Sequence, residues 1–142
     1  MTAFNTTALE LALSALKRSI DVSVPLLNDK SISVAHKETL RAGVIQHFEF
    51  CYELAWKTLK RKLQLFSSDI ARIDTLSYQD LIRDGAQKGW IKNADKWLQY
   101  RHERNLTSQT YHVETADRVF HSAVTFYDDA MSLLQALKEK AK

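Results

Sequence analysis

The apolar residues of this chain recur every three or four positions over two long stretches, and this spacing limits what the chain can fold into. In residues 34–66 the spaced positions are Ile45, Phe48, Tyr52, Trp56, Leu59 and Leu63. In the stretch that opens near Val113 they are Ala116, Phe120, Ala123, Tyr127, Ala130, Leu134 and Leu137. Side chains three and four residues apart share one face of a helix. Both stretches are therefore predicted to be long amphipathic helices.

Very little interrupts the helical pattern, because the 142 residues include only 3 Gly and 1 Pro. A first helix is expected from about Asn5 to Val24, where Pro25 should end it. Shorter helices are expected from Ser77 to Gly89 and after Asn93, whereas residues 67–76 are expected to form a polar connection. The prediction is one all-α domain spanning residues 1–142, folded as an up-down antiparallel four- to five-helix bundle.

Composition narrows the class of protein without naming a function. The net charge of +3 and the pI near 9.0 are mild, so nucleic acid binding is allowed but not indicated. The single Cys51 excludes an internal disulfide, and no apolar run approaches the ~18 residues of a membrane span. We therefore expect a cytoplasmic protein that does not associate with membranes.

Two sequence features could indicate a bound metal or RNA, but each is better explained without a ligand. His47 and Cys51 share a helical face, but two residues fall short of the three or four ligands of a zinc site, so no metal is predicted. The densest basic run is made of Lys57, Lys60, Arg61 and Lys62. Most such runs are solvated faces, so RNA is kept only as a possible ligand of this run.

The most polar stretch, residues 104–112, lies between two predicted helices and is the candidate site. Arg104 can grip a phosphate or a carboxylate through its planar guanidinium. Asn105 and Gln109 can donate and accept hydrogen bonds beside it. A ring from the preceding helix, Trp97 or Tyr100, could stack on a base.

Two carboxylates on the longest predicted helix bear on the same site. Glu49 and Glu53 are four residues apart, and like charges at this spacing are mildly unfavourable. The pair therefore indicates a cation elsewhere in the fold. Glu49 and Glu53 either line a ligand groove or form a solvated face. Arg104 either binds a ligand or only neutralises Glu49 or Glu53 while Asn105 caps a helix end.

Two segments carry a resemblance to a known family. They are RAGVIQHFEFCYELAWKTLK at residues 41–60 and YRHERNLTSQTY at residues 100–111, with Trp97 before the second. Together they resemble the nucleotidyltransferase substrate-binding protein family of the HEPN superfamily, which includes the HepT-like toxins. The resemblance spans nearly the whole chain. It implies a helical bundle that forms a homodimer and pairs with a minimal nucleotidyltransferase, on which ATP and Mg are expected; no cofactor is expected on this chain.

The superfamily's hallmark is an Arg, four to six residues, and a His, often followed by x-Tyr. Arg104 matches the Arg and Tyr111 the Tyr, but Gln109 occupies the position of the His, and His112 lies outside the permitted gap. In a metal-independent ribonuclease the imidazole would move protons while Arg104 neutralised the phosphoryl charge. An amide cannot do this, and losing a positioned acid–base group costs roughly 100- to 10,000-fold in rate. Ribonuclease activity is therefore not favoured.

Three hypotheses remain open at this point. The preferred one is a non-catalytic substrate-binding and regulatory subunit of a toxin–antitoxin-like module, binding a nucleotide or another anionic group near Arg104. The alternative is a HepT-like ribonuclease toxin in which His112 or His102 replaces the missing His. The third is a helical dimer with only a scaffolding role. The resemblance also implies that the partner transferase can adenylylate the motif tyrosine, Tyr111.

Overall fold

The computed structural model describes residues 4–139, and within them the chain is helical with no strand. Its elements are α1 (Thr7–Leu27), α2 (Val34–Leu65), α3 (Ile70–Thr75), α4 (Tyr78–Gln87), α5 (Ala94–Asn105), the 3-10 turn η1 (Thr107–Gln109) and α6 (Val113–Lys138). The predicted all-α class is confirmed. None of the helices in the described part of the chain is both long and apolar enough to cross a membrane.

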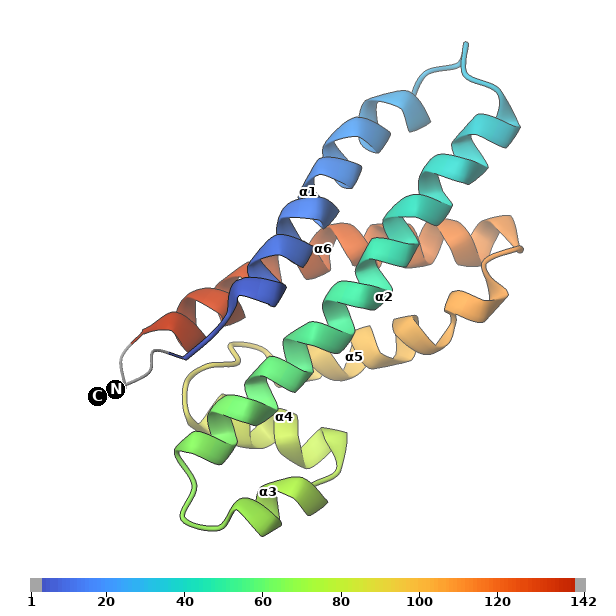
Figure 1. Cartoon of the computed structure of the whole chain (residues 1–142). Helices are drawn as coiled ribbons and strands as arrows, with labels where there is room; N and C mark the ends of the chain where they lie inside the picture. The colour runs from blue at the N-terminus through green and yellow to red at the C-terminus, as the bar shows by residue number, and fades with distance from the viewer. Residues whose placement is uncertain (1–3, 140–142) are drawn as a thin grey trace.

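Helix α2 is the centre of the fold and packs against every other α-helix. Figure 1 shows α1 and α2 as a long antiparallel hairpin, with α6 lying across it and α5 running beside the middle of α2. The predicted stripe on α2 is buried, apart from the half-buried Trp56, and so are the flanking Val44, Cys51, Ala55 and Thr58. A face this broad is what a helix needs when it contacts several neighbours.

Helix α1 continues through the residue that was expected to end it. Pro25 lies inside α1, which runs on to Leu27. A proline this close to the end of a helix removes only one backbone hydrogen bond, so the last turn survives. The buried face of α1 also shifts near this end, since Val24 is 38% exposed whereas Ser23 is buried. The prediction that the helix stops at Val24 was wrong.

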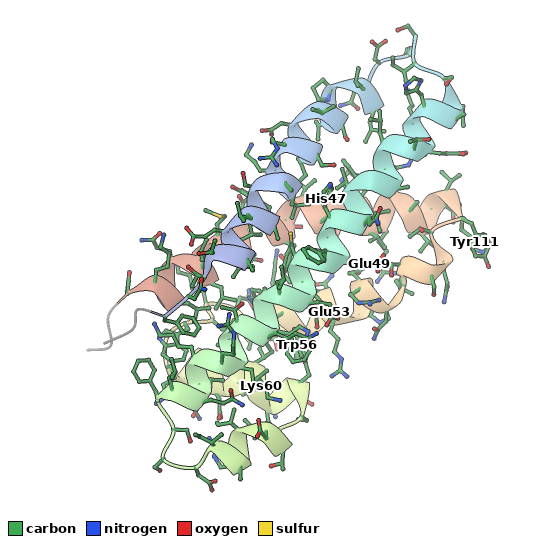
Figure 2. All side chains as sticks on the ribbon, in the orientation of Figure 1. His47, Glu49, Glu53, Trp56, Lys60 and Tyr111 are labelled. Carbon is green, nitrogen blue, oxygen red and sulfur yellow. The ribbon has the colours of Figure 1, made fainter. Side chains whose placement is uncertain are left out.

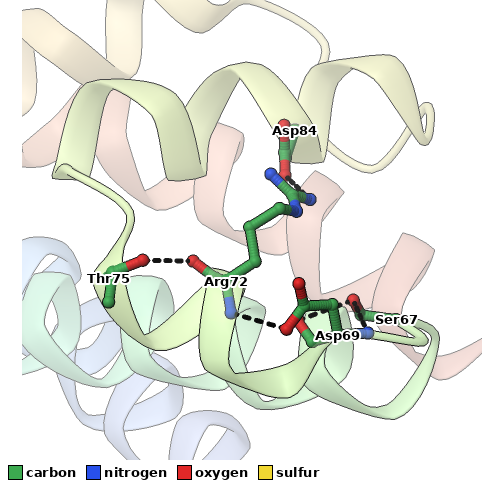
Figure 3. Close-up of polar contacts among 5 residues, drawn as sticks. All are labelled: Ser67, Asp69, Arg72, Thr75 and Asp84. Atoms are coloured by element: carbon green, nitrogen blue, oxygen red, sulfur yellow. Dashed lines mark hydrogen bonds and ion pairs between the residues drawn. The ribbon is translucent and has the colours of Figure 1, made fainter.

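The polar connection expected at residues 67–76 contains the short helix α3. The Asp69 side chain accepts a hydrogen bond from the backbone N–H of Arg72, and the Ser67 hydroxyl accepts one from the backbone N–H of Asp69. The Arg72 guanidinium then pairs with Asp84 of α4 at 2.9 Å, as Figure 3 shows. A six-residue helix is too short to be stable alone, so caps and this contact, together with the buried Ile73, hold it.

The caps expected at the starts of α4 and α5 are confirmed. Ser77 and Asn93 accept hydrogen bonds from the backbone N–H groups of Asp80 and Lys96, at the starts of α4 and α5. Gly89 has a φ of +78°, the left-handed conformation predicted for it after α4. Helix α5 is thus oriented by a defined turn, which determines where its C-terminal residues lie.

A buried ion pair fastens α5 to α6. The Glu103 side chain is 1% exposed, its Oε1 accepts a hydrogen bond from Arg118 Nε at 3.1 Å, and a terminal nitrogen of Arg118 lies 3.0 Å from the same oxygen. The other oxygen of Glu103 has no partner among the described residues. Because Glu103 precedes Arg104, this pair also sets the rotation of α5 at the candidate site.

Candidate functional site

The last turn of α5 places Arg104 beside two carboxylates of α2. Arg104 Nε lies 3.4 Å from Glu53 Oε1, and a terminal nitrogen lies 3.8 Å from Glu49 Oε2. Glu49 and Glu53 lie one turn apart on the same side of α2 (Figure 2). All three side chains remain about one third exposed. The cation indicated by the like-charged pair is therefore Arg104.

A cleft of about 470 Å³ opens beside this ion pair. Three cationic side chains line it: Lys60 of α2, and Arg101 and Arg104 of α5. Glu53 is the carboxylate among the lining residues. Glu49 and Asp74 lie outside the lining and pair with Arg104 and Lys60, so Arg101 is the cleft cation left to attract an anionic ligand.

Among the three cations of the cleft, Arg101 is the one without an ion-pair partner in the described residues. It is exposed, its guanidinium lies 4.9 Å from the centre of the Tyr78 ring, and it forms no ion pair with a described residue. Sequence reasoning missed Arg101, although its position three residues before Arg104 places both on one helical face. Lys60, by contrast, was noted in the basic run and lies 4.0 Å from Asp74.

The aromatic wall of the cleft differs from the one expected. Trp97 and Tyr100 are 2% and 3% exposed, and both pack edge-on against Phe126 in the core. The expectation that either ring stacks on a base is therefore contradicted, because neither has a free face. Arg101 and Arg104 lie one turn after Trp97 and Tyr100 on α5, and their longer side chains reach the cleft while the two rings stay buried.

Trp56 and Tyr78 line the cleft together with the buried ring of Tyr52. Trp56 and Tyr78 meet edge to face, with ring centres 6.2 Å apart. Trp56 was assigned to the core by its place in the apolar stripe, but it is only half-buried. A partly exposed indole next to cations is the combination that binds bases of single-stranded nucleic acid or nucleotides.

The polar stretch, residues 104–112, does not line a single cleft. Asn105 lines the cleft with Arg104, whereas Gln109 is exposed in η1 and does not. Tyr111 is 78% exposed and lines a different pocket, with its ring centre 4.3 Å from that of His112. The nine residues therefore form two neighbouring surfaces.

The two histidines considered as substitutes for Gln109 do not contact Arg104. His102 lies two positions before Arg104 on α5, so its side chain points to a different side of the helix. His112 precedes α6, and its side chain caps none of the first-turn amides. Neither forms a described hydrogen bond with a residue of the cleft.

Cys51 and His47 do not form part of a metal cluster among the described residues. The Cys51 thiol is fully buried and donates a hydrogen bond to the backbone carbonyl of Ala12 at 3.1 Å. Burial raises the pKa of this thiol to about 12. Cys51 is thus a small buried hydrophobe.

The basic run of α2 has one member that is not solvated. Lys62 is 4% exposed and donates hydrogen bonds to the carbonyls of Leu137 and Glu139, at the end of α6. The rings of Phe66 and Trp90 surround its ammonium group at 5.5 Å. Lys57 and Arg61 are exposed, so the run does not form one continuous basic patch.

One relative and two solved structures are similar to this chain. A Haemophilus influenzae protein named "Probable ribonuclease HepT" is 38% identical over 104 residues, which cover 73% of this chain and 71% of that protein. A solved Haemophilus influenzae structure, described as the fold of a substrate binding domain of a nucleotidyltransferase, has a TM-score of 0.86 and 32% identity, covering 95% of this chain and 100% of that one. A Thermus thermophilus structure has a TM-score of 0.71 and 25% identity, covering 92% of this chain and 99% of that one.

The match to a family extends over nearly all the residues discussed above. Residues 5–139 match the family described as "Nucleotidyltransferase substrate binding protein like". This range contains α1 to α6, the Arg104 cleft and the pocket beside Tyr111. The chain belongs to the nucleotidyltransferase substrate-binding-protein-like family.

Proposed function

We propose that this protein is the substrate-binding and regulatory subunit of a minimal nucleotidyltransferase, and that the Arg104 cleft holds an anionic group such as a nucleotide. The observation that carries the proposal is the gathering of Lys60, Arg101 and Arg104 around one cleft that also contains the Trp56 ring. The family and the description of the Haemophilus influenzae structure support the partner. The partner would hold ATP and Mg and perform the catalysis, while this subunit acts as a homodimer.

The contacts of Arg104 bear on how such a site works. Its guanidinium is held by Glu49 and Glu53 at 3.8 and 3.4 Å, distances that are long for charge-assisted hydrogen bonds. An incoming phosphate therefore competes with two carboxylates for Arg104, while Arg101 meets no such competition. Arg101 would make the first contact with the anion, and Arg104 would then turn from the carboxylates to share it.

Binding of ATP measured by isothermal titration calorimetry tests the proposal. We expect Arg104→Ala and Arg101→Ala each to weaken binding by about tenfold or more, because each removes a charged hydrogen-bond donor. Arg83→Ala is the matched control, since Arg83 is an exposed arginine of α4 that does not line the cleft. If neither cleft variant differs from Arg83→Ala, the ligand does not bind here.

Association with the transferase is a separate test of the same proposal. The product of the adjacent gene should co-purify with this chain as a stable complex. A purely scaffolding dimer instead predicts that Arg104→Ala changes the free energy of unfolding and no binding event. Analytical ultracentrifugation of the chain alone would measure the proposed homodimer.

The ribonuclease alternative is favoured by one observation, the name of the 38% identical relative. Against it, Gln109 stands where the acid–base residue is needed, and no described contact joins His102 or His112 to Arg104. Metal-free RNA cleavage that disappears in both Arg104→Ala and His112→Ala would establish the alternative. In an inactive nuclease scaffold, Gln109→His should restore some cleavage.

We also propose that Tyr111 is a site of adenylylation by the partner. Its phenol is 78% exposed, which makes the hydroxyl accessible to a second protein. The oxygen would attack the α-phosphorus of ATP, forming a phosphodiester and releasing pyrophosphate while the phenolic proton is lost. Intact-mass analysis after incubation with the partner and ATP should show the adduct in the wild type and not in Tyr111→Phe.

A further inference from the structure

A second pocket lies between α2 and the start of α6, apart from the Arg104 cleft. It has a volume of about 340 Å³ and is lined by Arg41 and Ile45 of α2 and by Thr110, Tyr111, Val113 and Ala116. None of these residues lines the Arg104 cleft. Its volume falls at the lower end of the range of small-molecule sites, about 300–1,000 Å³.

Arg41 is the cation of this pocket and lacks a partner for its charge. It forms no ion pair with a described residue, and its Nε is buried without a hydrogen bond from the protein. Glu38 also lines the pocket but does not pair with Arg41. A buried donor that stays unpaired costs about 1–3 kcal/mol, and more when the group is charged. An acceptor supplied by a ligand in the pocket would remove that cost.

The start of α6 adds to the attraction for an anion. Val113, its first residue, lines the pocket, and His112 before it provides no side-chain cap. The first amide N–H groups of a helix have no partner within the helix, and the helix dipole favours negative charge there. Arg41 and the start of this 26-residue helix therefore act on the same space.

The remaining walls suit a flat organic group attached to the anion. Ile45 and Ala116 are buried apolar residues at the pocket, and the Tyr111 ring beside them is exposed. An exposed aromatic ring is a stacking surface for a base. The carboxylate of Glu38 is an acceptor for sugar hydroxyls or for an exocyclic amine.

We propose that this pocket binds a nucleoside monophosphate, with its phosphate at Arg41 and the start of α6 and its base against Tyr111. The site is independent of the Arg104 cleft and does not require that the cleft bind anything. It would place a nucleotide directly beside the hydroxyl of Tyr111.

Calorimetric titration of the full-length chain with AMP at low ionic strength tests the proposal. Arg41→Ala should weaken AMP binding by about ten- to a hundredfold, because a charged donor is lost, and Arg41→Lys should weaken it less. Tyr111→Ala should weaken binding of AMP but not of inorganic phosphate, and adenosine should bind more weakly than AMP. Arg83→Ala, which lies at neither pocket, should bind AMP as the wild type does.

Several results would overturn the proposal. They are an absence of AMP binding at millimolar concentration, equal affinity of Arg41→Ala and the wild type, or loss of AMP binding in Arg104→Ala alone. Tyr111 is exposed, so Tyr111→Ala should keep the fold and serves as a second test if Arg41→Ala is unstable. Unchanged AMP affinity in Tyr111→Ala would also contradict the proposed pose. Loss of ATP binding at the Arg104 cleft, by contrast, would refute only the proposed function.

Discussion

Removing Arg118 should destabilise the protein far more than removing other arginines of similar exposure. Arg118 is 56% exposed, yet it is the described ion-pair partner of Glu103, whose side chain is 1% exposed. Arg118→Ala would leave a carboxylate buried between α5 and α6 without its cation. Isolated buried charges are among the most costly groups in a folded protein.

The size of the effect follows from the geometry of the pair. Losing one member of a buried pair costs about 3–5 kcal/mol. Because the guanidinium is half in solvent, we take the lower end, about 3 kcal/mol. The unfolding entropy is about 2.1 cal/mol/K per residue, or about 0.3 kcal/mol/K for the whole chain, so Tm should fall by about 10 °C.

Urea unfolding followed by far-ultraviolet circular dichroism at pH 7 and one fixed protein concentration measures the change. The double variant Glu103→Gln/Arg118→Ala should regain at least half of the lost stability, since it removes the stranded charge. Arg83→Ala, whose ion pair with Asp80 spans 3.9 Å on the surface of α4, should change the free energy by less than about 0.5 kcal/mol. A loss below about 1 kcal/mol in Arg118→Ala would refute the reasoning.

Three further predictions rest on other contacts. Glu53→Gln should raise the affinity of the Arg104 cleft for ATP by about two- to fivefold, measured by calorimetry, because it removes one competitor for Arg104; a lower affinity would contradict this. Cys51 should not react with a thiol reagent at pH 8 until urea unfolds the chain, and rapid native labelling would disprove its burial. The pKa of this thiol is raised to about 12 in the fold, so its stabilising contribution is complete below the unfolded value near 8.5 and is lost as pH rises toward 12. Lys62→Ala should cost about 2–4 kcal/mol in urea unfolding, because the carbonyls of Leu137 and Glu139 lose their donor and the aliphatic stem leaves a gap; a cost like that of the exposed Lys57→Ala would show that the contact is weak.

The amino-acid pattern by itself determined the helices and most of the core. Spacings of three and four fix which side of a helix is apolar, and caps such as Ser77 and Asn93 act within one turn, so both depend only on neighbours in sequence. Two of the predictions about helices were wrong. A proline near the end of a helix removes a single backbone hydrogen bond, so α1 continues past Pro25. The polar composition of residues 67–76 gave no sign of α3, which depends on the pairing of Arg72 with Asp84 of α4.

What sequence could not determine is which polar groups meet across helices. Arg104 could be singled out from its motif, and Glu49 and Glu53 from their unfavourable spacing, but the contact among them required α5 to dock on α2. Trp97 was expected at the site and is buried, whereas Trp56 was expected in the core and lines the cleft. An apolar position on a helix is buried only where another helix packs on it. The docking of α5, where the buried Glu103 pairs with the half-exposed Arg118, placed Trp97 in the core and Arg101 at the cleft. The pocket of Arg41 and Tyr111 likewise joins residues 70 positions apart, and such pairings come only from tertiary packing.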